Sequence, residues 1–165
     1  MKPTGIFATG LVLIETLDGD ITLSQSILTE DTSVDAIILN AGKNTAVGTT
    51  TGRDIVVSGS PTLTTGSGGI AKLFSGSDAN STGLTTLVGG NTNVRTQVDE
   101  TTTTFSPVLS SNNAYVLYRM NSVPEEIDKI AGDYTASFLG STVIPAPSVF
   151  VTDAFGYPYA GQEVT

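Results

Sequence analysis

A repeat of about 34 residues limits the folds open to this chain more than any other feature. The run from Gly19 to Ser24 (GDITLS) reappears from Arg53 to Ser58 (RDIVVS), with an offset of 34 residues between Asp20 and Asp54. A second match runs from Ala36–Gly42 to Ala71–Gly76, with an offset of 35 residues that we interpret as one extra residue near Pro61. Similarity at a fixed period indicates stacked copies of one supersecondary unit.

A third copy of the repeat is degenerate. We interpret Leu84–Val88 as its opening strand and Ala114–Tyr118 as its closing strand. An insertion that contains the threonine tract from Thr101 to Thr104 separates the two. Before the first copy, residues 6–14 also have the composition of strands.

Each full repeat holds three short β-prone runs separated by turn-forming residues. The runs are 20–24, 26–30 and 36–40 in the first copy, then 54–58, 61–65 and 71–75 in the second. Three strands and three turns per repeat are what one coil of a parallel β-helix requires, because each coil is covered by the next. We therefore predict an all-β fold over residues 1–119, a right-handed parallel β-helix or solenoid of about three coils, with Val56 and Leu73 inside. An antiparallel β-sandwich with chance similarity between strands is the alternative.

Residues 120–147 have a different character. Ser122, Pro124, Glu125 and a terminal Gly132 form the pattern of a capped helix over 124–131. We expect this short helix to cover the open end of the solenoid. The run Ile144–Pro147 then predicts a stiff, extended linker.

The composition excludes most chemistry. The chain has no cysteine and no histidine, so thiolate nucleophiles, imidazole bases and the usual zinc ligands are all missing. A net charge of −9 without a cluster of Lys or Arg disfavours nucleic acid as a partner. No apolar run approaches the length that crosses a bilayer, so we expect no membrane insertion. We also expect no metal and no cofactor.

The segment 148–165 resembles the opening of bacterial immunoglobulin-like domains of the invasin/intimin type. Two strand-like runs flank a turn with Asp153, Gly156 and Pro158, and the other matching positions are Val149, Val151, Gly161, Val164 and Thr165. Tyr157 stands where that family usually has Asn. The resemblance implies the truncated start of such a module.

The stretch from Gly19 to Arg119 resembles the β-helical repeats of haemagglutinin-type secreted bacterial adhesins, through its Gly-Asp-Ile-Thr-Leu opening and its Asn-Ala-Gly corner. The resemblance implies a non-enzymatic structural and display segment of a large adhesin, secreted or on the bacterial cell surface. Expected partners are neighbouring repeat domains of the same chain and a host or neighbouring-cell glycan or protein. A glycan-binding adhesin tip is the alternative function, and a polysaccharide-acting β-helix enzyme is a second one.

The repeat would stack Asp20 on Asp54, one strand spacing apart. Two carboxylates that close repel, so a cation such as calcium would fit there, although six or more oxygen ligands are needed. We favour turn-capping roles for both, with Arg53 as the counter-charge.

Two tyrosines are the candidate ligand-binding residues. Sugars stack on exposed aromatic rings, and Tyr115 and Tyr118 could serve in that way. The candidate acids of an enzyme, Asp35, Asp78 and Asp99, are scattered relative to the repeat. The threonine-rich runs do not keep the equal spacing of an ice-binding ladder, so we assign them ordinary β-propensity.

Overall fold

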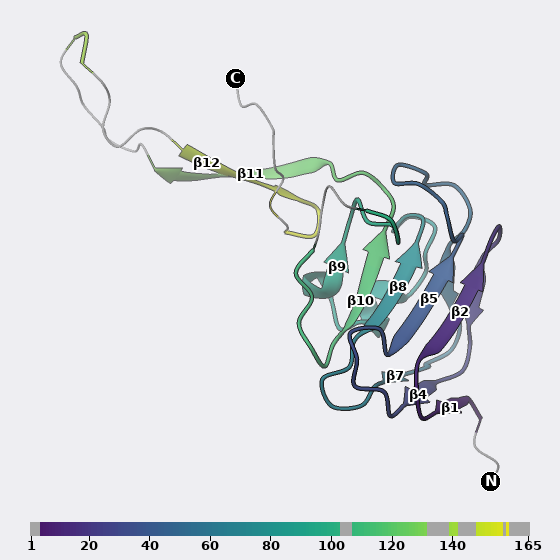
Figure 1. Ribbon diagram of the computed structural model, residues 1–165. Helices are drawn as coiled ribbons and strands as arrows, with labels where there is room; N and C mark the ends of the chain where they lie inside the picture. The colour runs from purple at the N-terminus through teal and green to yellow at the C-terminus, as the bar shows by residue number, and fades with distance from the viewer. Residues whose placement is uncertain (1–3, 103–106, 132–138, 142–147, 157, 159–165) are drawn as a thin grey trace. The chain divides into compact units, whose positions relative to one another are not determined.

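The computed structural model describes residues 4–102, 107–131, 139–141, 148–156 and 158 (Figure 1). The chain divides into two compact units, Met1–Asn121 and Ser122–Thr165. The described part is mostly β-structure, with β11 (Pro124–Ala131) and β12 (Ser148–Asp153) in the second unit. The first unit contains β1 (Ile6–Ala8), β2 (Val12–Thr16), β3 (Ile21–Leu23), β4 (Ile27–Thr29), β5 (Ile37–Ala41), β6 (Ile55–Val57), β7 (Leu63–Thr64), β8 (Ala71–Ser75), the helix α1 (Leu84–Leu87), the 3-10 helix η1 (Asn91–Asn93), β9 (Val94–Arg95) and β10 (Ala114–Tyr118).

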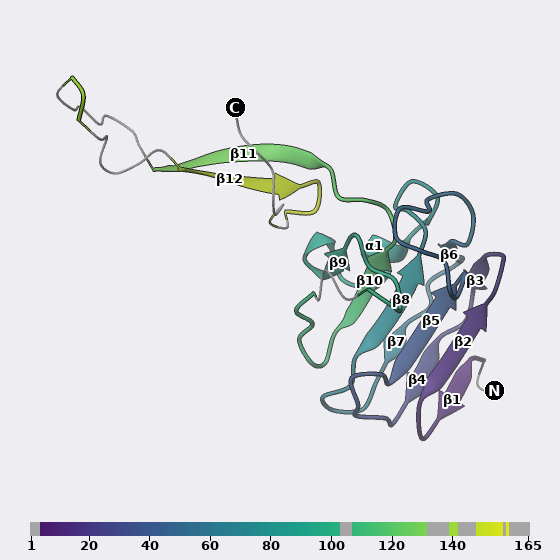
Figure 2. The same cartoon turned by 45° about the horizontal axis from the view of Figure 1, so that its top comes forward.

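The first unit is built from three parallel sheets. Sheet A has the order β1-β4-β7, sheet B the order β2-β5-β8-β10-β9, and sheet C the order β3-β6 (Figure 2). From β1 to β8 the chain passes through the sheets in the cycle A, B, C, so each strand lies beside the strand of the previous cycle. This is a parallel solenoid arrangement, as the repeat predicts. Because every strand pair of this unit is parallel, the antiparallel sandwich is wrong.

The strand register corrects the offsets read from the sequence. In sheet C, Ile21 pairs with Ile55, which confirms the offset of 34 residues. In sheet B, Ile37 rather than Ala36 pairs with Ala71, so the offset is again 34 and not 35. The offset differs only in sheet A, where Ile27 of β4 pairs with Leu63 of β7, 36 residues later. A shift of one residue matters because it moves every side chain of a strand to the opposite face of its sheet.

The core lies between the three sheets, where side chains stack in columns from coil to coil. Leu39, Leu73 and Val116 occupy one column of sheet B, and each is fully buried. Leu73 is therefore inside, as predicted. The prediction for Val56 is wrong, because Ile55 points into the core and Val56 is only half-buried.

The third copy of the repeat departs from the first two. Its opening segment forms the short helix α1 instead of the predicted strand, and the Val57 amide donates to the Thr82 carbonyl at 2.9 Å just before that helix. Its closing strand β10 is confirmed and pairs with β8. Inside the insertion, β9 pairs with the far side of β10, and part of the threonine tract lies outside the described residues. Neither helix of the described residues is long and apolar enough to span a membrane.

The helix predicted over 124–131 is wrong, because this segment is the strand β11. It pairs antiparallel with β12, with Ile127 opposite Val151 and Lys129 opposite Val149. Capping signals stabilise a helix by about 1 kcal/mol each, whereas pairing with β12 engages one edge of the whole eight-residue strand. Residues 142–147, where the linker was predicted, lie outside the described residues.

The turn expected after residue 152 is present in the second unit. The amides of Phe155 and Gly156 donate to the side chain and the carbonyl of Asp153, both at 2.9 Å. Gly156 has a φ of 79°, a left-handed conformation that favours glycine. Thr152 forms a single antiparallel bridge with Pro158. The rest of the predicted second run, including Gly161, Val164 and Thr165, lies outside the described residues.

Candidate functional site

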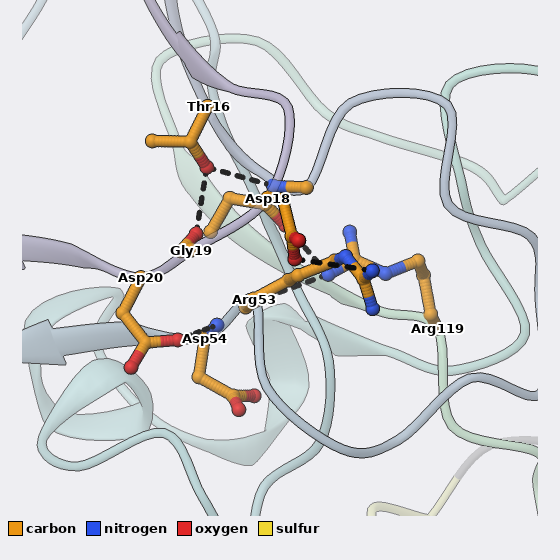
Figure 3. A network of polar contacts seen from close by, with 9 residues as sticks. Thr16, Asp18, Gly19, Asp20, Arg53, Asp54 and Arg119 are labelled. Atoms are coloured by element: carbon orange, nitrogen blue, oxygen red, sulfur yellow. Dashed lines mark hydrogen bonds and ion pairs between the residues drawn. The ribbon is translucent and has the colours of Figure 1, made fainter.

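Polar and charged side chains gather where the chain leaves sheet B and enters sheet C. We call this place the B–C corner; Figure 3 shows Thr16, Asp18, Gly19, Asp20, Arg53, Asp54 and Arg119 within it. Thr16 is the last residue of β2, and Asp18, Gly19 and Asp20 follow it. Arg53 and Asp54 precede β6, and Arg119 follows β10. The corner is therefore assembled from successive coils, and its residues come together only because the coils stack.

Both repeat aspartates bind the backbone of the following coil. The Asp54 amide donates to Oδ1 of Asp20 at 2.8 Å. Oδ1 of Asp54 accepts from the Ser77 amide at 3.1 Å and from the Ser81 hydroxyl at 3.2 Å. These bonds give both aspartates a structural role, but they run to residues 23 to 34 positions away and not to the turns in which the aspartates lie. The two aspartates differ in burial, because Asp54 is only 3% exposed whereas Asp20 is exposed.

Arg53 has the local counter-charge role that was predicted for it, although its ion pair is with a different aspartate. Its Nη2 lies 3.1 Å from Oδ1 of Asp18, whose side chain is 81% exposed. Exposed ion pairs of this kind contribute little to stability. Arg53 has a φ of 60° in the turn before β6, and an added Cβ at Gly42 would overlap with the Arg53 side chain. Glycine at position 42 therefore lets the two ends of the β5–β6 connection approach closely.

Arg119 is a central residue of the B–C corner that the sequence analysis did not single out. It is fully buried, and its Nη2 donates to the carbonyls of Ala41 at 2.6 Å and Arg53 at 2.7 Å. Burial lowers the pKa of its guanidinium, while the carboxylates of Glu100 and Asp54 oppose that shift. Its guanidinium thus ties the end of β10 to both ends of the β5–β6 connection. A charged residue directly after an apolar closing strand was the one available signal in the sequence.

The two candidate ligand-binding tyrosines are buried, so neither offers the exposed ring that sugar stacking needs. Tyr115 is 2% exposed and packs on the outer face of sheet B with Phe74 and Val98. The Arg95 guanidinium lies 5.0 Å from its ring centre. The insertion between β9 and β10 covers this face, because Val98 belongs to it.

Tyr118 is fully buried and points toward the core side of β10. Its hydroxyl donates to Oδ1 of Asp78 at 3.2 Å. Burial and the neighbouring Asp78 carboxylate raise the pKa of this hydroxyl. The expectation that these tyrosines bind a ligand through exposed rings is therefore wrong.

The remaining acids each have a separate structural partner. Asp35 forms an ion pair with Lys72 at 2.6 Å, and Asp78 accepts from Tyr118. Asp99 accepts from the side chains of Thr101 and Thr102. Within the described ranges, no group of three or more carboxylates is positioned to hold a metal ion. Asp20 and Asp54 alone do not supply the six oxygen ligands that calcium needs.

The threonine runs do not form an ice-binding ladder. In sheet A the outward column is Phe7, Leu28 and Thr64, and in sheet C Thr22 lies beside Val56. Threonine therefore does not repeat from coil to coil at these positions.

Comparison of the chain with protein-family models, with curated proteins and with solved structures finds no match.

Proposed function

We propose that this chain is a non-catalytic structural and display segment of a large bacterial adhesin, secreted or held at the cell surface. A right-handed winding of the solenoid is part of this proposal. One observation carries it most directly: Asp20 and Asp54, the acids that repeat with the coil, accept hydrogen bonds from the backbone of the next coil. Groups used in this way hold coils together and are not free to act on a substrate.

The character of the rest of the chain supports the same function. Absence of cysteine and histidine removes the side chains on which most hydrolytic mechanisms depend. Tyr115 and Tyr118 are buried and do not offer a platform for sugars. The resemblance to adhesin repeats in residues 19–119 supplies the cellular setting, with neighbouring repeat domains of the same polypeptide as the constant partners.

The decisive experiment is binding of the purified chain to a glycan array and to host cells, together with turnover assays on acidic and neutral polysaccharides. A display segment should give no saturable binding and no cleavage. The heat-unfolded chain is the matched control for adsorption. Saturable sugar binding by the folded chain alone would instead support the glycan-binding tip, and cleavage would support the polysaccharide-acting enzyme.

The proposed location has its own test. In cells that produce the full-length protein, a membrane-impermeant amine reagent should modify Lys43, whose side chain is 41% exposed. Modification of Lys43 only after the cells are permeabilised would contradict display at the surface.

A further inference from the structure

Sheet A ends one strand earlier than the sheet beside it. Among the described residues, β7 is its last strand, whereas sheet B continues past β8 to β10. The helix α1 lies next to β6, where the next strand of sheet C would stand. The chain then passes from α1 through η1 to β9, which belongs to sheet B. In the third copy of the repeat, none of the described residues therefore forms a strand of sheet A, while α1 and β10 occupy the places on both sides.

A groove follows the free edge of β7 at this place. One part, of about 580 Å³, is lined by residues that include Val57, Leu63, Thr86 and Leu87. A second part, of about 200 Å³, shares Leu63 and is bounded by residues 112–114 ahead of and at the start of β10. We call the two parts together the strand slot. Its walls are α1 on one side and residues 112–114 on the other, and none of its lining residues is charged.

The backbone of β7 directs hydrogen-bonding groups into the strand slot. The Ile27 amide of β4 donates to the Thr62 carbonyl at 2.9 Å. In a parallel ladder, alternate residues direct both backbone groups to the same neighbour. Leu63 therefore directs its N–H and its C=O away from β4, toward the slot.

The side-chain columns specify what would fit beside Leu63. Ile6, Ile27 and Leu63 form one inward column of sheet A, and all three are large aliphatic residues. Ile27, which has a strand on both sides, is fully buried, whereas Leu63 is only half-buried. An aliphatic side chain placed next in the column would cover Leu63 and extend the core by one layer.

We propose that the strand slot binds an extended, uncharged peptide segment of a partner protein, which pairs with β7 as a fourth strand of sheet A and places an aliphatic residue opposite Leu63. The lining without charges, in a chain of net charge −9, favours an uncharged segment. Main-chain bonds supply affinity in this mode of recognition, and the side-chain pocket supplies selectivity. This binding is additional to the structural role proposed above and does not depend on it.

The test uses the full chain and a capped hexapeptide with the sequence of residues 4–9, Thr-Gly-Ile-Phe-Ala-Thr. This peptide carries the aliphatic residue of the β1 position in the column and has no charge. Titration followed by backbone amide NMR should give saturable shifts centred on Leu63 and α1. With isoleucine opposite Leu63, the phenylalanine amide donates to the Leu63 carbonyl, while the isoleucine amide points away.

Two matched pairs of variants distinguish strand pairing from nonspecific hydrophobic binding. N-methylation of the phenylalanine amide should raise the dissociation constant about tenfold, whereas N-methylation of the isoleucine amide should leave it nearly unchanged. In the protein, Thr86→Trp should fill the slot and abolish binding, while Thr22→Trp, on the exposed face of sheet C, should not.

Three results would overturn the proposal. The first is a lack of saturable binding at millimolar peptide. The second is equal binding of the two N-methylated peptides. The third is a dimer of the chain that the hexapeptide dissociates, which would assign the slot to β1 of a second copy and not to a partner protein.

Discussion

Replacing Asp54 should test whether the B–C corner is a structural device. Asp54 is 3% exposed, and its Oδ1 accepts from the Ser77 amide and the Ser81 hydroxyl. A hydrogen bond to a charged group contributes about 1.5–3 kcal/mol, and a buried donor left unpaired costs about 1–3 kcal/mol. Both bonds are long, and the Ser81 hydroxyl keeps its contact with Ser75 at 2.7 Å. We therefore expect Asp54→Ala to lower the free energy of unfolding by about 2–3 kcal/mol.

Two companion variants give the expected order of effects. Asp54→Asn keeps an acceptor oxygen facing Ser77 and should cost about 1 kcal/mol. Asp20→Ala removes the acceptor of the Asp54 amide, but Asp20 is exposed, so water can take its place. The cost there should stay below about 1 kcal/mol.

Urea unfolding followed by far-ultraviolet circular dichroism measures these differences, with the midpoint compared at constant slope. Equal losses for Asp54→Ala and Asp20→Ala would refute the reasoning from burial. The same samples should show no change in midpoint when calcium chloride is added. A calcium-dependent rise that Asp20→Asn removes would assign the aspartate pair to a cation.

Three further predictions concern the core, the corner and the second unit. Leu73→Asp should cost about 4 kcal/mol or more because it buries a charge without a partner, while Thr64→Asp on an exposed position should be mild; equal urea midpoints would mean that the faces are misassigned. Gly76→Ala should lower the melting temperature, since its Cβ would lie 2.6 Å from an aspartate oxygen, whereas Gly10→Ala meets no atom within 4 Å and should not. Deletion of residues 148–165 removes the partner of β11 but should leave the calorimetric transition of the first unit in place, and loss of that transition would contradict the division into two units.

The sequence predicted the stacked strands well because the relevant signals repeat. The run 20–24 contains β3 and the run 36–40 covers all of β5 except Ala41, while their copies in the second repeat contain β6 and β8. A residue pattern that recurs at a fixed period can be satisfied only if equivalent positions have equivalent neighbours, which is the case in a stack of coils. The contact between Asp20 and the Asp54 amide, 34 residues later, follows from the same period.

Prediction was less successful where one residue or one distant contact decides the outcome. The offset of Ala71 was wrong by one position, because the similarity of small and aliphatic residues does not fix a register. Tyr115 was expected to be exposed, but the insertion that contains Val98 folds over its face of sheet B. Nothing in the local sequence of either segment specifies that contact.

The sequence by itself determined the mostly β character, the coil period and the absence of histidine and cysteine chemistry, because these depend on composition and on local runs of residues. Only the tertiary structure decided that Pro124–Ala131 is a strand, since its partner β12 lies further along the chain and outweighs the helix signals at Ser122. The tertiary structure alone also placed Arg119 at the carbonyls of Ala41 and Arg53. Both outcomes depend on contacts between residues far apart in sequence. Local sequence patterns do not include the energy of such contacts.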